Sequence, residues 1–380
     1  DGNTDAIRTL ELTQNTILTA EFAQSFSGQC GDSLYWELVD TTLHITGNGE
    51  MYDYKSNTIP WKLLVSSIKV LTIAEDVTKL NQSFFICSVL ESVVWNARHV
   101  ADASIFYGIC SQITSFTFGE AVEYIPAYLC SGCSKLTSVT IPNSVTSIGG
   151  AAFEDCSSLT SVHITDLAAW CNIDFENYSA NPLYYAHKLY LNGELVKDLV
   201  IPNSVTSIGS SAFEGCTSLT SVTIPNSVTS IGNNAFYGCS SLTSVTIPNS
   251  VTNIGYDAFN GCNKLVDVYC YATTPPITEN ESTFSHYNAF LYVPCESKKA
   301  YMVDAVWGNF KYIECISSDN VTTDEIVVTP SENEANVIWP SVNGAATYEL
   351  VIRDKNGNIV CTLIFNANGQ LTSIAFNAPS

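Results

Sequence analysis

Positive charge is scarce in this chain of 380 residues: 15 lysines and arginines stand against 37 aspartates and glutamates, which gives a net charge of −22. So few cations argue against nucleic acid or an anionic membrane as a partner, because little is available to neutralise phosphates. A run of about 18 apolar residues is also lacking, so no transmembrane segment is expected. The chain opens with polar residues and no signal-peptide pattern, as a mature or trimmed chain would. Hydrophobic residues make up 46% of the chain, which favours an ordered protein.

Motifs for catalysis and for cofactor binding are missing as well. The sequence has no GxSxG, P-loop, dinucleotide fingerprint or HExxH, and its five histidines are scattered. Cys130 and Cys133 form a CxxC, for which a redox or metal site is one interpretation. No second CxxC follows at zinc-ribbon spacing, and both cysteines fit the repeat described next. We therefore expect no enzyme, no catalytic residues, no metal and no cofactor.

The chain is instead rich in a 23-residue repeat. From Ile201 it reads IPNSVTSIGSSAFEGCTSLTSVT, then IPNSVTSIGNNAFYGCSSLTSVT, then IPNSVTNIGYDAFNGC. A cysteine recurs every 23 residues within each of two blocks, with Leu or Ile three residues later. These cysteines are Cys87, Cys110, Cys133, Cys156, Cys216, Cys239 and Cys262. Such a period predicts a leucine-rich repeat solenoid of α/β to mainly β class, right-handed, with parallel strands.

One coil can be interpreted from the period-two rule for strands. The inward side chains are those of Leu219, Val222 and Ile224, followed by Val228, Ile231 and Phe236. Ser221 and Thr223 point outward, Pro225 ends the strand, and Gly232 permits a positive φ. A single coil cannot offset its backbone ordering cost of about 1–2 kcal/mol per residue, so the coils must stack.

Fourteen cysteines resemble a disulfide framework at first sight. Most of them, including Cys130 and Cys270, fall in the repeat frame, where coils stack about 4.8 Å apart and disulfide geometry does not fit. We expect a ladder of buried free thiols. The cysteines outside the frame are Cys30, Cys171, Cys295, Cys315 and Cys361. A disulfide between Cys295 and Cys315 is one alternative for this group.

The frame divides the chain into parts. We expect an N-terminal arm, a hairpin cap around 40–42 and a degenerate first coil over 1–72, then repeats over 73–270 with an insert at about 165–200. Asn192-Gly193 predicts a hairpin in the insert. A C-terminal cap follows over 271–316, where Pro275-Pro276 stops the repeat, 296–306 forms a helix, and Trp307 and Phe310 plug the last coil. A polar linker over 317–325 leads to a small β module over 326–380.

The repeat resembles the BspA-like leucine-rich repeats of bacterial surface proteins. So do the leader SGQCGDSLYWELVDTTLHITGNGEMYDY, the insert with DLAAWC and NPLYYAHKLYLNGEL, and the tail after LYVP. The resemblance covers about residues 25–316, and it implies export, cell-surface attachment and adhesion or host binding, without catalytic residues. Residues 326–380 resemble the first half of a fibronectin type III domain with Trp339 and Tyr348 as core aromatics. Such a domain needs about 90 residues, so the module is cut or degenerate.

Two surfaces are candidates for ligand binding. The insert supplies Trp170, Tyr184 and Tyr185, because aromatic side chains are enriched at interaction hot spots; packing against the solenoid is the alternative. The outer face of the strands carries a lattice of hydroxyls, for which a plain solvated sheet is the alternative. Its members are Ser221, Thr223, Ser244 and Thr246, with Ser115, Thr117, Ser138, Thr140 and Ser161 upstream. We predict an extracellular or cell-surface module that binds a protein or glycan, with host matrix among the candidate ligands; the alternative is a rigid spacer presenting another domain.

Overall fold

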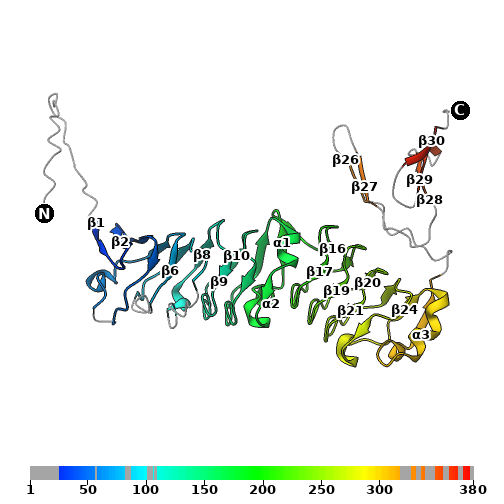
Figure 1. Ribbon diagram of the computed structural model, residues 1–380, viewed down its shortest axis with the longest axis horizontal. Helices are drawn as coiled ribbons and strands as arrows, with labels where there is room; N and C mark the ends of the chain where they lie inside the picture. The colour runs from blue at the N-terminus through cyan, green and yellow to red at the C-terminus, as the bar shows by residue number, and fades with distance from the viewer. Residues whose placement is uncertain are drawn as a thin grey trace.

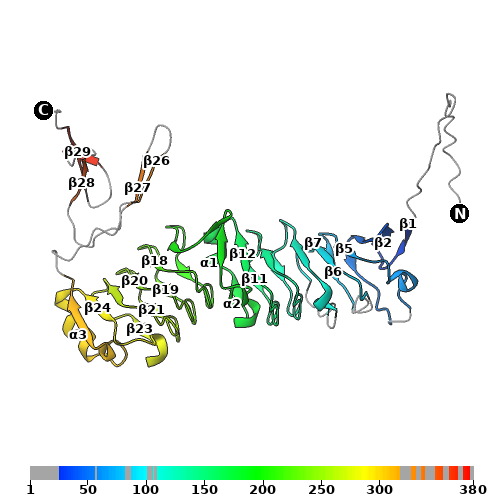
Figure 2. The same cartoon turned by 180° about the vertical axis from the view of Figure 1, so that it is seen from behind.

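The computed structural model describes residues 25–55, 58–81, 87–100, 106 and 109–316, and the backbone of five further strands between residues 327 and 376. Over the main part the chain winds into successive coils along one axis, as Figures 1 and 2 show from opposite sides. A regular coil gives one strand of three or four residues to a first face and a two-residue strand to a second face. Turns close the coil. Residues 1–24 and 317–325, and the aromatic positions Phe84 and Tyr107, lie outside the described residues.

The first face consists of parallel strands from consecutive coils. Partners in the regular coils stand 23 residues apart, as in Ser138↔Ser161 and Ser221↔Ser244. Its strands are β5 (Val70–Ile73), β7 (Ser92–Trp95), β8 (Ser115–Phe118), β10 (Ser138–Thr140), β12 (Ser161–Ile164), β14 (Leu189–Leu191), β16 (Asp198–Val200), β18 (Ser221–Thr223), β20 (Ser244–Ile247), β22 (Asp267–Cys270), β24 (Phe290–Val293) and β25 (Tyr312–Cys315). The alternation of buried and outward residues along these strands is what the repeat predicts.

The second face is built from much shorter strands. They are β9 (Tyr124–Ile125), β11 (Ser147–Ile148), β13 (Asp174–Phe175), β17 (Ser207–Ile208), β19 (Ser230–Ile231), β21 (Asn253–Ile254) and β23 (Ile277–Thr278). Their pairs are parallel too, with Ile231 opposite Ile208 and Ile254 opposite Ile231. All three of these isoleucines are buried, so the core lies between the two faces.

The N-terminal end is covered by an antiparallel hairpin. Strands β1 (Ser25–Gln29), β2 (Leu34–Val39) and β3 (Thr42–Gly47) pair antiparallel, and β3 then pairs in parallel with β5. Strands β4 (Gly49–Glu50) and β6 (Val77–Lys79) and the 3-10 helix η1 (Lys62–Leu64) complete this end. Leu34, Trp36 and Leu38 of β2 are buried. The hairpin therefore supplies the edge on which the first coil stacks.

A column of phenylalanine rings runs through the regular coils. Phe213, Phe236, Phe259 and Phe284 stack in sequence with ring centroids 5.3 Å apart, and neighbouring planes lie within 7° of parallel. All four side chains are buried. The column forms because every coil places the same ring at the same position, one coil spacing from the next.

The repeat cysteines form a second column. Cys216, Cys239 and Cys262 are fully buried free thiols, and burial raises the pKa of Cys262 to about 12. The Cys239 Sγ donates to the carbonyl oxygen of Phe213 at 3.2 Å, and the Cys262 Sγ donates to that of Phe236 at 3.3 Å. The predicted ladder of buried free thiols is thus confirmed for these coils. The thiols also bond each coil to the one before it.

The cysteines outside the frame differ in environment. Cys30 and Cys171 are buried, whereas Cys295 is exposed and Cys315 half-buried. All four are free thiols, so no Cys295–Cys315 bridge is present, but these two thiols are hydrogen-bonded to one another. The side chain of Cys361 lies outside the described residues.

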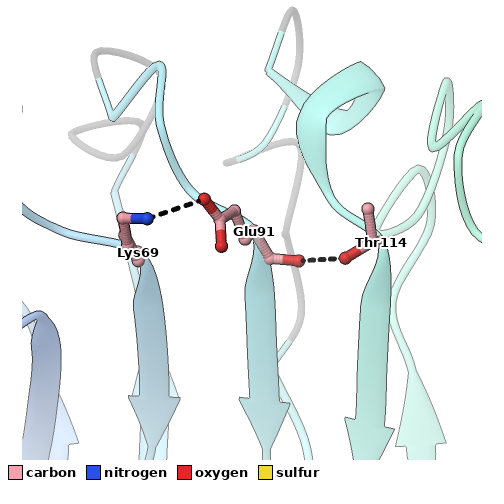
Figure 3. A network of polar contacts seen from close by, with 3 residues as sticks. All are labelled: Lys69, Glu91 and Thr114. Carbon is pink, nitrogen blue, oxygen red and sulfur yellow. Dashed lines mark hydrogen bonds and ion pairs between the residues drawn. The ribbon is translucent and has the colours of Figure 1, made fainter.

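Threonine hydroxyls tie neighbouring coils together at the start of the first-face strands. Thr114 Oγ1 donates to the carbonyl oxygen of Glu91 at 3.2 Å, and the Glu91 carboxylate pairs with Lys69 Nζ at 3.1 Å (Figure 3). The same 23-residue bond recurs at Thr160, Thr220 and Thr243, and beside the second face at Thr146, Thr229 and Thr252. These threonines recur because their hydroxyls satisfy a carbonyl of the previous coil, in addition to fitting strand geometry.

The prediction of a positive φ at Gly232 is wrong. Positive φ occurs at Asn234 (55°) and Gly238 (70°) of that coil. Glycine is needed at 232 for another reason: a Cβ there would lie 2.6 Å from the backbone nitrogen of Ser210 in the preceding coil. The glycine therefore permits close approach of two coils.

The prediction that Pro275-Pro276 stops the repeat is also wrong. Strand β23 follows these prolines and pairs with β21, and β24 continues the first face beside β22. The 3-10 helix η6 (Glu281–Thr283) then leads to Phe284, which extends the ring column. The prolines precede a two-residue strand, so the missing amide donors cost little there.

The C-terminal end is closed by aromatic side chains. Trp307 and Phe310 pack on Phe284 with ring centroids 5.3 and 5.2 Å away, and both are buried, as predicted for a plug. The helix expected over 296–306 is shorter: η7 (Cys295–Ser297) precedes α3 (Lys298–Val303), and η8 (Trp307–Asn309) follows. Beyond it, β26 (Val327–Pro330) pairs with β27 (Ala335–Ile338), and β28 (Thr347–Arg353), β29 (Ile359–Asn366) and β30 (Leu371–Phe376) form an antiparallel sheet. Trp339 and the Tyr348 side chain lie outside the described residues.

Candidate ligand-binding site

The insert forms an irregular coil of the solenoid. Strand β14 pairs in parallel with β12, and Asn192 (φ 51°) and Gly193 (φ 86°) turn the chain into β15 (Glu194–Leu195), as the Asn-Gly pair predicts. Two short helices, α1 (Leu167–Cys171) and α2 (Leu183–Ala186), stand where regular coils have turns and short strands (Figure 1). Strand β15 does not pair with β16, so a new first-face sheet begins after the insert.

Helix α2 is anchored to the next coil by a buried asparagine. Asn181 is fully buried; its Nδ2 donates to the carbonyl oxygen of Ser211 at 2.7 Å, and its Oδ1 accepts from the Leu183 amide at 2.8 Å. At the other end of α2, His187 has a φ of 60°, and its Nδ1 lies 2.9 Å from the carbonyl oxygen of Gly215. Because a carbonyl only accepts, Nδ1 carries the proton in this bond. Both ends of α2 are therefore fixed against the coil that follows.

A groove lies between α2 and the turns of the following coils, and we call it the tyrosine groove. Its volume is about 470 Å³, within the range of about 300–1,000 Å³ usual for small-molecule sites. It is lined by Ser157, Tyr184, Tyr185, His187, Gly215, Thr217, Tyr237 and Gly238. Tyr184 and Tyr185, predicted as binding residues, are half-buried in it, and Tyr237 is exposed. The groove thus joins the insert to two regular coils.

The prediction for Trp170 is corrected by its burial. The Trp170 side chain is 1% exposed, and its Nε1 donates to the carbonyl oxygen of Ala212 at 2.9 Å. It also packs edge-on against Phe175. Trp170 fastens the insert to the next coil, so it is not available to contact a ligand at the surface.

The rings of the groove meet at steep angles. Tyr184 and Tyr185 lie edge to face, with centroids 5.1 Å apart and planes at 81°, and Tyr178 stands 5.2 Å from Tyr184. Burial raises the pKa of Tyr185 to about 12, and the nearby charges of Glu154 and Asp155 add to the effect. Burial also raises the pKa of Tyr184. The phenols are therefore neutral at physiological pH.

Glu214 is the buried carboxyl beside the groove. The residue is 4% exposed, Ser211 hydrogen-bonds to its carboxyl group, and Oε2 has no hydrogen-bond partner. Burial raises the pKa of Glu214, because the charged carboxylate loses its hydration and the single hydrogen bond with Ser211 compensates for only part of that loss. The charge of Glu214 also raises the pKa of the neighbouring Tyr184.

The predicted hydroxyl lattice is aligned on the first face, and its residues do not line the tyrosine groove. Ser221 lies opposite Ser244, and Thr223 opposite Thr246, across paired strands. Ser221 Oγ also donates to Asp198 Oδ1 at 2.7 Å. These residues are half-buried or exposed. They come from strands, whereas the groove comes from turns, so the predicted binding residues belong to two separate surfaces.

Sequence reasoning missed two sets of residues. In the groove it missed Tyr237, which occupies the variable position of the AFxGC segment, where Glu214 stands one coil earlier. A comparison of that position between coils would have found it. On the first face it missed the outward rings of β24 and β25, which are Phe290, Tyr292 and Tyr312; Tyr292 stacks on Tyr269 of β22.

Other site types receive no support from the described residues. Cys130 and Cys133 are both buried, as the repeat positions predict. Within the described ranges no cluster of three His, Cys, Asp or Glu side chains could hold a metal ion. No helix in the part of the chain that the structure describes has the length and apolar character needed to cross a membrane.

Comparison with known proteins gives a family match. The model of the BspA type leucine-rich repeat region matches residues 99–180 and 186–299, in six copies. The match ends before residues 326–380, so the fibronectin type III resemblance of that module is unsupported. No curated protein matches the chain.

Several solved structures are similar at low identity. A leucine-rich repeat protein from Eubacterium ventriosum is 21% identical, covering 72% of this chain and 80% of its own, with a TM-score of 0.39. A leucine-rich cell surface protein from Faecalibacterium prausnitzii is 19% identical, covering 78% and 96%, with a TM-score of 0.35. The pneumococcal vaccine antigen PcpA is 14% identical, covering 78% and 100%, with a TM-score of 0.38.

Proposed function

Because the chain belongs to the BspA-type leucine-rich repeat family, we propose that it is a binding module on the bacterial surface or secreted from the cell. Proteins of this family typically serve as non-enzymatic scaffolds for binding, in keeping with a role in adhesion to a protein or glycan. The tyrosine groove is the observation that carries the proposal. It is a ligand-sized hollow of about 470 Å³ at the place where the insert interrupts the 23-residue repeat.

The binding residues of this proposal are Tyr184, Tyr185 and Tyr237. Tyrosine suits recognition because it offers a large ring and a polar tip with few rotatable bonds. The three tyrosines line one groove although Tyr237 lies in a turn 52 residues after Tyr185 in the chain. The hydroxyls of Ser221, Thr223, Ser244 and Thr246 form a second, flatter polar surface that a larger ligand can also contact.

The proposal is tested by presenting the full chain to arrays of glycans and of extracellular matrix proteins. We expect one class of immobilised ligand to retain the chain, and a Tyr184→Ala/Tyr237→Ala double variant to lose at least tenfold in affinity. Tyr256→Ala is the matched control, because Tyr256 is a similarly exposed tyrosine of a neighbouring coil that does not line the groove. Retention that is equal for the double variant and the control would place binding elsewhere.

A rigid spacer is the second candidate. The threonine and cysteine bonds between successive coils favour it, since they stiffen the solenoid whether or not a ligand binds. Absence of any retained ligand, together with cooperative and reversible unfolding of the full chain, would favour the spacer over the binding module.

A further inference from the structure

The rings of the tyrosine groove have the arrangement that attracts a cation. The face of an aromatic ring carries negative potential, and a cation within about 6 Å of the ring centre is stabilised by it. Tyr184 and Tyr185 lie edge to face at 81°, so the edge of one ring covers part of the face of the other, and both side chains line the groove. Tyr237 lines the same groove from the second coil after the insert. Three tyrosine rings thus border the space that a charged group would enter.

Carboxyl groups lie near the tyrosines of the groove. The carboxyl groups of Glu154 and Asp155 are close enough to Tyr185, and that of Glu214 close enough to Tyr184, for each to act on the phenol. No lysine or arginine is among the residues that line the groove. A cationic group that enters therefore lies near carboxylates, and none of the lining residues is a lysine or arginine that would compete with it.

His187 adds an acceptor at the rim. Its Nδ1 donates to the carbonyl oxygen of Gly215, so Nε2 is the ring nitrogen that can accept a hydrogen bond when the imidazole is unprotonated. Thr217 and Ser157 place two hydroxyl groups on the other sides of the groove. The polar atoms that face a ligand thus include acceptors matched to N–H donors.

We infer that the tyrosine groove binds the side chain of an arginine or lysine on a protein ligand. This inference rests on the proposed function and specifies the chemistry of its partner. The guanidinium group suits the site best, because its flat face stacks on aromatic rings and its five N–H groups reach several acceptors. A neutral sugar would gain no charge attraction from the carboxylates of Glu154 and Asp155, which lie near Tyr185.

A single-arginine probe tests this inference apart from the array. Acetyl-Gly-Arg-Gly-amide is titrated into the full chain and followed by NMR, beside the same peptide with citrulline, which has the same shape without the charge. We expect the arginine peptide to bind at least fivefold more tightly, and more weakly as salt rises. Equal affinity of the two peptides would overturn the inference even if the array identifies a groove ligand.

Variants separate the rings from the carboxylates. Tyr237→Phe keeps the ring and should retain the arginine peptide, whereas Tyr184→Ala/Tyr237→Ala should abolish its preference over citrulline. Glu154→Gln/Asp155→Asn should lower arginine affinity severalfold; asparagine is suitable because Asp155 has a positive φ of 58° that it tolerates. Loss of preference in the Tyr256→Ala control would show that the probe binds outside the groove and would contradict the inference. If the array instead yields a neutral glycan that competes at the groove, the binding function stands and the cation site does not.

Discussion

Truncation of Phe236 to alanine is the sharpest test of the stacked core. The ring is fully buried, and it lies between Phe213 and Phe259 with both centroids at 5.3 Å. Phe→Ala in a packed core costs about 3–5 kcal/mol, from lost burial and from the cavity left behind. The two flanking rings are held by their own coils and cannot collapse into the gap, so a value near the upper end is expected.

The measurement is urea unfolding of the full chain, followed by circular dichroism and by hydrogen exchange. Stability in a solenoid is a sum of neighbour terms, so exchange should accelerate first in the coils on either side of Phe236. Tyr256→Ala is the control, since an exposed tyrosine of the next coil should change stability by no more than about 0.5 kcal/mol. A loss below about 1 kcal/mol for Phe236→Ala would refute the idea that this column holds the coils together.

Three further predictions concern buried thiols, a buried carboxyl group and the close approach of two coils. In a Cys361→Ser chain, a thiol reagent should label Cys295 and Cys315 in the native state and the eleven buried thiols only after unfolding; rapid native labelling of more than two contradicts the fold. The pKa of Glu214 is raised in the folded state, so its contribution to stability falls as pH rises above the ordinary value of about 4.3. Glu214→Gln should therefore match the parent near pH 4 and exceed its melting temperature at pH 7, and a constant difference across that range would speak against a raised pKa. Gly232→Ala should destabilise the chain by more than about 1 kcal/mol in urea melts because its Cβ meets backbone of the preceding coil, and a neutral effect would show that the coils can move apart.

The core of the solenoid was predictable because it depends on position within the repeat. Residues such as Leu219, Val222 and Cys239 recur in phase, and a recurring apolar position has only the interior to occupy. The leucine-rich repeat fold and the buried thiols followed from this alone.

The errors arose where contacts between coils decide the outcome. Gly232 looks like a turn glycine in one coil, yet its role appears only when Ser210 of the preceding coil is placed beside it. Pro275 and Pro276 end a repeat by local rules, but pairing with β21 carries the chain past them. Neither effect is visible within a single repeat.

The candidate site was predictable only in part. The aromatic character of the insert pointed to Tyr184 and Tyr185, but composition could not separate these half-buried positions from the fully buried Trp170. The indole of Trp170 is in the core, where it donates a hydrogen bond to the carbonyl oxygen of Ala212. Tyr237 lies far along the chain and completes the groove only because α2 is anchored through Asn181.

The constant offset of the threonine bonds has a consequence for how such a gene can change. Each hydroxyl reaches a carbonyl 23 residues earlier, as Thr220 reaches Lys197 and Thr243 reaches Thr220. Deletion or duplication of one whole unit by recombination between near-identical copies would leave every donor facing an equivalent acceptor. A frame-preserving insertion of one codon inside a unit would misalign its donor instead, so the length of the molecule is free to evolve in whole steps.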